Sequence, residues 1–135
     1  MVERERGAVK KFILCAAAAI FLAAGAAWAQ GALDAAKAAF EKNPTAETAG
    51  KLAAVFSESD AAENGFRYFG RAATPLHRAA GEYGRGEVFL AEYRWEEALA
   101  AYAESRTLYD ALGDKRSAAA CLRQMSRAEI SKGDN

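Results

Sequence analysis

The side chains that most often carry catalysis are few in this chain, and they do not stand at catalytic spacings. His77 is the only histidine, and no cysteine or second histidine is placed to complete a ligand set with it. Glu96 and Glu97 are adjacent, and adjacent helical residues point about 100° apart, so their carboxylates cannot flank one bond. The sequence has no Gly-rich phosphate loop, nucleophile elbow or Cys-x-x-Cys pair.

We therefore expect no enzymatic activity, no cofactor and no metal ion. His77 is interpreted as a residue that caps a turn. Glu96 and Glu97 are interpreted as the solvated first turn of a helix, where the helix dipole favours negative charge. An enzyme or a carrier of small ligands would need a deep polar pocket, which no pattern in the sequence requires.

Residues 1–29 have the layout of a signal peptide. Four basic residues precede the stretch 12–29, which is apolar apart from one Gly and ends in an Ala-Trp-Ala triplet. We expect cleavage between Ala29 and Gln30 and export to the periplasm or the extracellular space. The alternative is an uncleaved anchor in the inner membrane, because the stretch is just within the about 17–25 residues that span a bilayer.

The remaining residues, 30–135, suffice for one domain and not for two. Removal of the leader takes away four basic and two acidic side chains, which leaves no basic bias and excludes a typical nucleic-acid-binding face. Cys121 is the only cysteine in 30–135, so no internal disulfide can form. We interpret Cys121 as a small apolar residue packed within a helix pair, with an intermolecular or redox-active thiol as the alternative.

Composition and break points predict an all-α domain. Alanine is abundant and β-branched residues are scarce, which disfavours strands. Thr74 offers a capping hydroxyl and Pro75 suits the first position of a helix. Short connections make consecutive helices pack as antiparallel hairpins. The expected helices cover roughly 32–42, 45–57, 60–72, 75–91, 95–109 and 115–132.

One spacing occurs twice along the domain. A small residue is followed by an aromatic three positions later, by a second small residue after twelve and by a second aromatic after sixteen. Small residues would let two antiparallel helices approach closely, and the aromatics would fill the space between one hairpin and the next. The small pairs are Ala53 with Gly65 and Gly86 with Ala98, and the aromatics are Phe56, Phe69, Phe89 and Tyr102.

The second copy of this spacing resembles a tetratricopeptide repeat (TPR). Its segment 92–102, Glu-Tyr-Arg-Trp-Glu-Glu-Ala-Leu-Ala-Ala-Tyr, is similar to the turn and second helix of that family, and the resemblance extends over 45–135. It implies antiparallel helical hairpins stacked as a short right-handed superhelix of about 2.5 repeats after an N-terminal helix. The third repeat lacks its second helix. A rival interpretation is an ankyrin repeat, because 74–79 matches Thr-Pro-Leu-His-x-Ala, but that motif has no second copy.

The TPR register implies a shallow groove lined by the first helix of each repeat. Arg123 and Arg127 stand one turn apart and could hold a carboxylate through paired charge-assisted hydrogen bonds. The alternative is that they are ordinary surface arginines. The groove residues that this register predicts are Tyr83, Glu87, Leu90, Arg123, Arg127 and Ile130.

The sequence thus predicts a non-catalytic protein-protein interaction module of the periplasm or cell envelope, binding a peptide or helix of a partner as an accessory or assembly factor. Nucleic acid is not an expected partner, and a membrane is contacted only through the N-terminal segment. The alternative is a membrane-anchored structural subunit of an envelope complex. Self-association through the open third repeat is a further expectation.

Overall fold

The computed structural model describes residues 24–59, 61–71 and 73–134. These residues form helices and no strand, which confirms the predicted all-α class. The chain divides into two compact units, Met1–Ala32 and Leu33–Asn135. The first 23 residues of the predicted leader lie outside the described residues. None of the helices in the described ranges is both long enough and apolar enough to cross a membrane.

The helices follow the breaks expected from the sequence, with four boundaries shifted by two residues or more. The first described helix covers 24–42 and therefore begins before position 32, because its Ala-rich sequence contains no proline and its two glycines only lower helix propensity. This helix includes Ala29 and Gln30, the predicted cleavage site. The others are α2 (Ala46–Glu58), α3 (Ala62–Phe69), α4 (Pro75–Ala91), α5 (Trp95–Leu112) and α6 (Lys115–Gly133).

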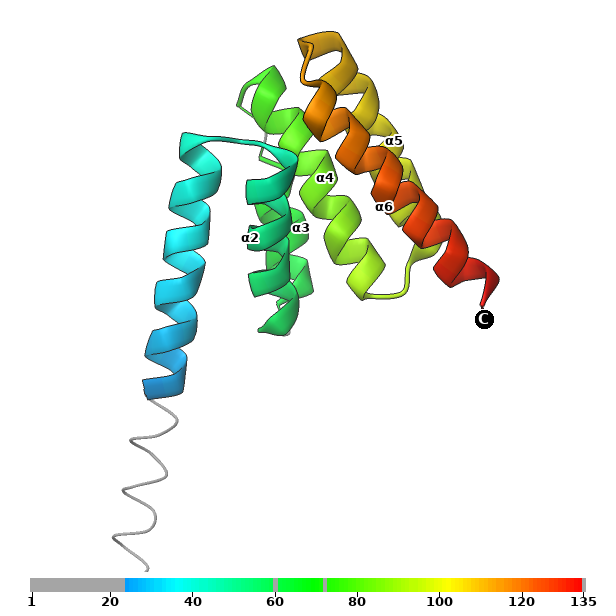
Figure 1. The fold of residues 1–135 in the computed structure, drawn as a ribbon. Helices are drawn as coiled ribbons and strands as arrows, with labels where there is room; N and C mark the ends of the chain where they lie inside the picture. The colour runs from blue at the N-terminus through cyan, green and yellow to red at the C-terminus, as the bar shows by residue number, and fades with distance from the viewer. Residues whose placement is uncertain (1–23, 60, 72, 135) are drawn as a thin grey trace, which may run out of the picture. The chain divides into compact units, whose positions relative to one another are not determined.

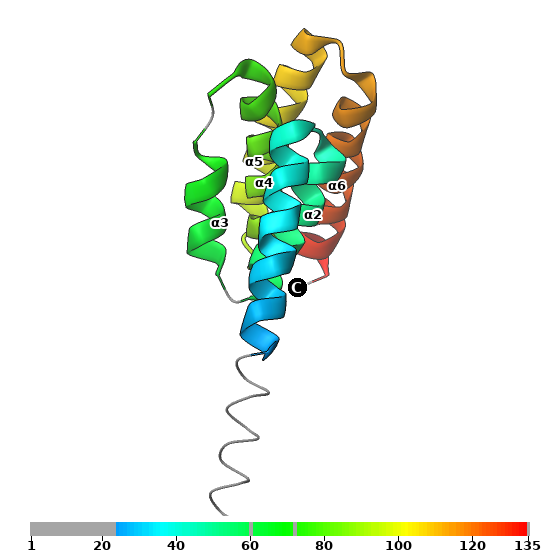
Figure 2. The same cartoon turned by 90° about the vertical axis from the view of Figure 1, so that its left-hand side faces the viewer.

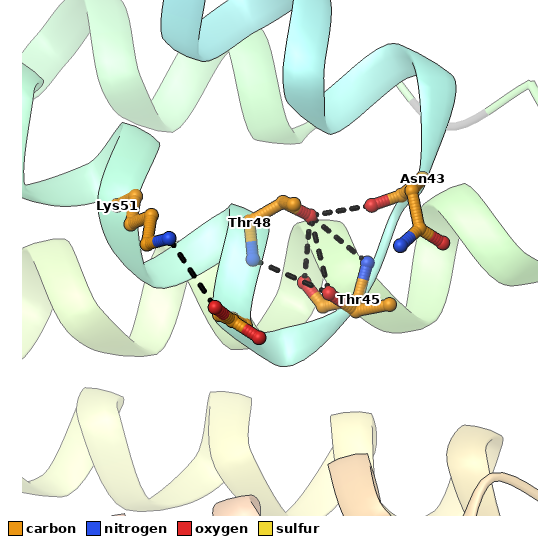
Figure 3. A network of polar contacts seen from close by, with 5 residues as sticks. Asn43, Thr45, Thr48 and Lys51 are labelled. Atoms are coloured by element: carbon orange, nitrogen blue, oxygen red, sulfur yellow. Dashed lines mark hydrogen bonds and ion pairs between the residues drawn. The ribbon is translucent and has the colours of Figure 1, made fainter.

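A network of hydroxyl groups fixes the start of α2 (Figure 3). The Thr48 N–H donates to Thr45 Oγ1 at 3.3 Å, and the Thr45 N–H donates back to Thr48 Oγ1 at 3.0 Å. The Thr48 hydroxyl also donates to the Asn43 carbonyl at 2.6 Å. These bonds satisfy backbone groups that a helix start leaves without partners and hold the bend after the preceding helix.

The predicted cap of α4 is confirmed. Thr74 is its N-cap and accepts the His77 N–H at 3.2 Å, and Pro75 occupies the first helical position. The His77 side chain joins this cap, since its Nδ1 lies 2.7 Å from Thr74 Oγ1. The helix then runs without interruption to Ala91, which is longer than the ankyrin alternative would have it.

Three predicted boundaries are corrected. The third helix begins at Ala62 and not at 60, because Ser59 ends α2 instead, donating its hydroxyl to the Val55 carbonyl at 2.9 Å. It ends at Phe69 and not at 72. The fifth helix runs to Leu112 and not to 109, because the left-handed residue that ends it is Gly113, with φ 76°.

Within the unit Leu33–Asn135, each helix from α2 onward contacts the next in sequence, and α2 also contacts α4 and α6. In Figure 1, α2 and α6 lie on the side nearer to the viewer, with α4 between them. These two helices are close together where each begins, and they separate toward their C-terminal ends. In Figure 2, α3 lies on one side of this unit and α6 on the other. The helices α2, α4 and α6 therefore share a face, while α3 and α5 lie behind it.

The start of α2 is tied to the C-terminal helices. The Ala46 N–H donates to Ser117 Oγ at 3.3 Å, and the buried Tyr109 hydroxyl donates to the Pro44 carbonyl at 3.3 Å. Contacts between residues so far apart in sequence fix α2 against α5 and α6 at this end. The same face opens toward the other end, where α2 and α6 separate (Figure 1).

The eight repeat-packing residues are all buried. The atoms nearest to a Cβ placed on Gly65 would belong to Phe56 and Val88. Those nearest to one on Gly86 would belong to the Tyr102 ring, at 2.7 Å. Rings fill the spaces that the glycines leave, so the small residues here admit aromatic side chains.

The closest backbone approach involves glycines that the spacing did not single out. A Cβ on Gly81 would lie 2.5 Å from the carbonyl oxygen of Phe69, and one on Gly84 would lie 2.4 Å from the Phe69 ring. Phe69 also packs edge-on against Phe40 and Phe56. The contact between α3 and α4 is therefore built around Phe69, because Gly81 makes room for its carbonyl group and Gly84 for its ring.

Candidate functional site

The shared face of α2, α4 and α6 carries two hollows. The first, of about 400 Å³, lies where these helices converge. The start of α2 forms one wall through Thr45 and Glu47, and Tyr83 of α4 contributes to its lining. The opposite wall is the N-terminal half of α6, with Asp114, Arg116, Ser117, Ala120 and Arg123.

The second hollow, of about 240 Å³, lies farther along the same helices. Small side chains of α2 form one wall, Leu90 and Ala91 of α4 are apolar lining residues, and Arg127 of α6 stands at the other wall. Glu87 also lines it. The α2 residues are Ala53, Ala54 and Ser57. The two hollows are lined by the same three helices and share no lining residue, and we refer to them together as the α2/α4/α6 groove.

The predicted groove residues are distributed over these hollows with one exception. Tyr83 and Arg123 line the first, and Leu90, Glu87 and Arg127 line the second. Tyr83 is only 7% exposed and packs edge-on against Tyr102, so it forms part of the groove floor rather than an accessible contact. Ile130 is 66% exposed and lines neither hollow.

The carboxylates of the groove already have partners. Glu47 pairs with Lys51 at 3.2 Å, and Asp114 caps α6 by accepting the Ser117 N–H at 3.0 Å. Glu87 accepts a hydrogen bond from the Tyr102 hydroxyl at 2.7 Å, and Gln124 donates to the same oxygen. Their hydrogen-bonding capacity is thus largely used within the chain.

The link between Tyr102 and Glu87 connects the groove to the core. Tyr102 is fully buried, and burial, with the nearby Glu87 carboxylate as the next cause, raises its pKa well above the usual value. The phenol therefore stays protonated and donates to Glu87. Burial and Glu87 raise the pKa of Tyr83 in the same direction.

The arginines of the groove, in contrast, have no ion-pair or hydrogen-bond partner among the described residues. Arg116, Arg123 and Arg127 lie on one edge of α6 and form no ion pair or hydrogen bond with any other described residue. The arginines between 75 and 113 all pair with an acid, at 2.6 to 3.7 Å. These pairs are Arg78–Glu104, Arg85–Glu82, Arg94–Glu97 and Arg106–Asp110.

Arg116 is the groove residue that sequence reasoning missed. It precedes Arg123 by seven positions and Arg127 by eleven, a spacing that keeps all three on one side of a helix. The repetition of arginine at helical spacing is the sequence signal that indicates it. The α2 wall could not be found that way, because its small residues become a groove wall only when α6 stands opposite.

The other candidate residues lie outside the groove. His77 Nε2 is 3.3 Å from a Glu41 carboxylate oxygen. Glu97 is exposed and accepts two hydrogen bonds from Arg94, at 2.6 and 2.8 Å, which hold its pKa below the usual range. Glu96 is exposed and lies 2.5 Å from Lys132. Both acids stand in the first turn of α5, as predicted.

Cys121 is fully buried in α6, where the sequence placed it, and its Sγ lies 3.3 Å from the Ser105 hydroxyl. Burial raises the pKa of this thiol, which keeps it in the less reactive protonated form. In the described ranges, His, Cys, Asp and Glu side chains do not gather into a group of three that could hold a metal ion.

Comparison with known proteins yields no matching family model, no matching curated protein and no matching solved structure.

Proposed function

We propose that this protein is a short TPR-like, right-handed superhelix that binds a segment of a partner protein in the α2/α4/α6 groove and performs no catalysis. In this proposal α2–α3 and α4–α5 are two repeats, α6 is the first helix of a third, and the helix ending at residue 42 precedes them. The partner segment is acidic. The proposal includes export by the N-terminal segment and a role as an accessory or assembly factor in the cell envelope.

The observation that carries the proposal is the row of unpaired arginines along α6. Arg116, Arg123 and Arg127 span a distance of about 16 Å at 1.5 Å per residue, which suits several carboxylates along one segment. A guanidinium presents a planar fork of donors that matches a carboxylate. The groove's own acids are occupied, so the unused donors favour an acidic ligand.

The second hollow favours an apolar side chain beside the acidic ones. Ala53, Ala54 and Ala91 leave space next to Leu90, and these residues offer little hydrogen bonding. A segment with carboxylates toward α6 and an aliphatic side chain toward α2 would fit both walls. Burial of that side chain contributes affinity, while the arginines determine orientation.

The test is a pull-down from envelope extract that compares two double variants of equal charge change. Arg123→Ala/Arg127→Ala removes two groove arginines. Arg67→Ala/Arg71→Ala removes two arginines outside the groove that also lack a described ion pair. We expect one partner to be lost with the first pair, to be retained with the second, and to dissociate from the unaltered protein as salt increases. Equal capture by both variants would refute binding in the groove.

The alternative function, a membrane-anchored structural subunit, is favoured by one observation. A single helix covers 24–42 and passes through the Ala29–Gln30 bond without a break. Determination of the N-terminus after cell fractionation separates the two proposals. A soluble periplasmic protein beginning at Gln30 supports export with cleavage, whereas a full-length protein in the inner-membrane fraction supports the anchored subunit.

A further inference from the structure

The turn between α4 and α5 holds an exposed aromatic residue in an unfavourable backbone conformation. Tyr93 has φ 60°, and it is the only non-glycine residue with positive φ in the described ranges. Its side chain is 76% exposed, so burial does not compensate for this conformation. Glycine adopts such a φ without strain. This backbone conformation destabilises the fold, so the presence of tyrosine at this position indicates that its ring has a function.

The ring of Tyr93 forms one side of a hollow with a second aromatic. The Tyr93 and Trp95 rings stand edge-on, with centroids 5.5 Å apart and planes at 79°. The end of α6 supplies the other side through Ser131 and Asp134, and the hollow measures about 510 Å³. This hollow is separate from the α2/α4/α6 groove and shares no lining residue with it.

Asp134 is the acidic residue among those that line this hollow. It forms no ion pair with another described residue. Two cations adjacent in sequence to the lining residues are already engaged, because Lys132 lies 2.5 Å from Glu96 and Arg94 is held by Glu97. The hollow therefore offers a ligand one carboxylate that has no ion-pair partner among the described residues.

The cation–π contacts of the described residues involve other rings than these two. Lys37 lies over Phe56 and Tyr68, Arg85 over Phe89, and Arg94 over Phe66 and Phe89. Among the described residues no cation lies over Tyr93 or Trp95. Yet indole is the ring that attracts cations most strongly.

We propose that Tyr93, Trp95 and Asp134 form a binding site for an organic cation with a weakly hydrated head, of the alkylammonium or guanidinium class. The ring faces attract the cation through their quadrupoles, and Asp134 supplies the opposite charge. A neutral apolar ligand would gain from the rings but would gain nothing from Asp134. A trimethylammonium group and an arginine side chain present this same chemistry.

The test uses the full chain with Trp28→Phe, which leaves Trp95 as the only indole. The indole N–H resonance is followed by NMR while tetramethylammonium or N-acetyl-arginine methylamide is added. The neutral control is 3,3-dimethyl-1-butanol, which matches a choline head in shape, and sodium chloride matches the ionic strength. We expect a saturable shift with at least one cation and none with the controls. The cation that binds more tightly identifies the head group of the ligand as an alkylammonium or a guanidinium group.

Two variants test whether Tyr93 and Asp134 form the cation-binding site. Tyr93→Gly removes the ring and relieves the backbone strain, so it should fold at least as well while binding the cation about two- to fivefold more weakly. Asp134→Asn should weaken binding by a similar factor, and Glu58→Gln, an exposed carboxylate elsewhere, should not change it. Equal affinity for the neutral control, or unchanged affinity in folded Tyr93→Gly, would overturn the proposal.

Discussion

The two sides of α4 serve different purposes. On the side facing α3 and α5, Gly81 lies against the Phe69 carbonyl, while Gly84 and Gly86 admit the rings of Phe69 and Tyr102, at distances that leave no room for a methyl group. On the side facing the groove, Leu90 and Ala91 line an open hollow with no ring inserted. The comparison indicates that substitutions on the packed side should change stability, whereas those along the groove should change binding.

The packed side is tested most severely at Gly81. In Gly81→Ala the new Cβ would lie 2.5 Å from the Phe69 carbonyl oxygen, which belongs to the backbone and cannot rotate away. We expect the free energy of unfolding to fall by about 1–3 kcal/mol, even though alanine favours a helix. Urea denaturation followed by circular dichroism measures this change.

The control for Gly81 is a glycine with ordinary space around it. In Gly50→Ala of α2 the Cβ would lie 3.6 Å from the Tyr83 ring, which is normal contact. This variant should be stabilised by about 0.5–1 kcal/mol through helix propensity. Similar losses in both variants would mean that the packed side is not distinguished by close approach.

Tyr102 lies between the two sides, because its buried ring packs against Gly86 and its hydroxyl donates to Glu87 in the groove. Tyr102→Phe keeps the ring and removes this donor, so we expect a loss of about 1–2 kcal/mol in the free energy of unfolding. Tyr68→Phe is the matched control, since the Tyr68 hydroxyl donates to Glu41 at the surface and should matter little. If both substitutions lowered the free energy of unfolding equally, the hydrogen bond from Tyr102 to Glu87 would stabilise the fold no more than a hydrogen bond at the surface does.

The stability of the protein at alkaline pH also tests the burial of Tyr102. Burial raises the pKa of Tyr102, Tyr83 and Tyr109, so the folded protein retains phenolic protons that the unfolded chain releases near pH 10. Stability from these groups is complete below that pH and should decline as the pH rises above it, by about 1.4 kcal/mol per pH unit for each tyrosine. In Tyr102→Phe this decline, measured by urea denaturation, should be shallower; an unchanged slope would contradict burial as its cause.

The smallest effect on stability is expected at the groove edge. Arg123→Ala/Arg127→Ala removes two exposed side chains without a described ion pair, so the free energy of unfolding should change by no more than about 0.5 kcal/mol. Thermal denaturation measures this directly. A loss as large as that of Gly81→Ala would show that these arginines support the fold, and the distinction between the two sides of α4 would fail.

Local sequence determined the helices and most of their ends. Thr74 and Pro75 define the start of α4, and Gly113 with Asp114 separates α5 from α6, because capping and left-handed turns depend on residues within one helical turn. The position of Arg123 and Arg127 on one edge of α6 also follows from spacing alone. The burial of Cys121 was predictable from its helical context.

Tertiary structure decided which partner each side chain meets. The sequence paired Ala53 with Gly65, but the Cβ position of Gly65 lies nearest to Phe56 and to Val88 of α4, and the tightest approach to a backbone atom lies at Gly81. Likewise, the ion pair of Arg78 in α4 forms with Glu104, which α5 brings near, whereas the other arginine pairs between 75 and 113 join residues three or four positions apart. Helix formation is governed by neighbours along the chain, whereas these contacts exist only after the helices have packed, so no local pattern encodes them.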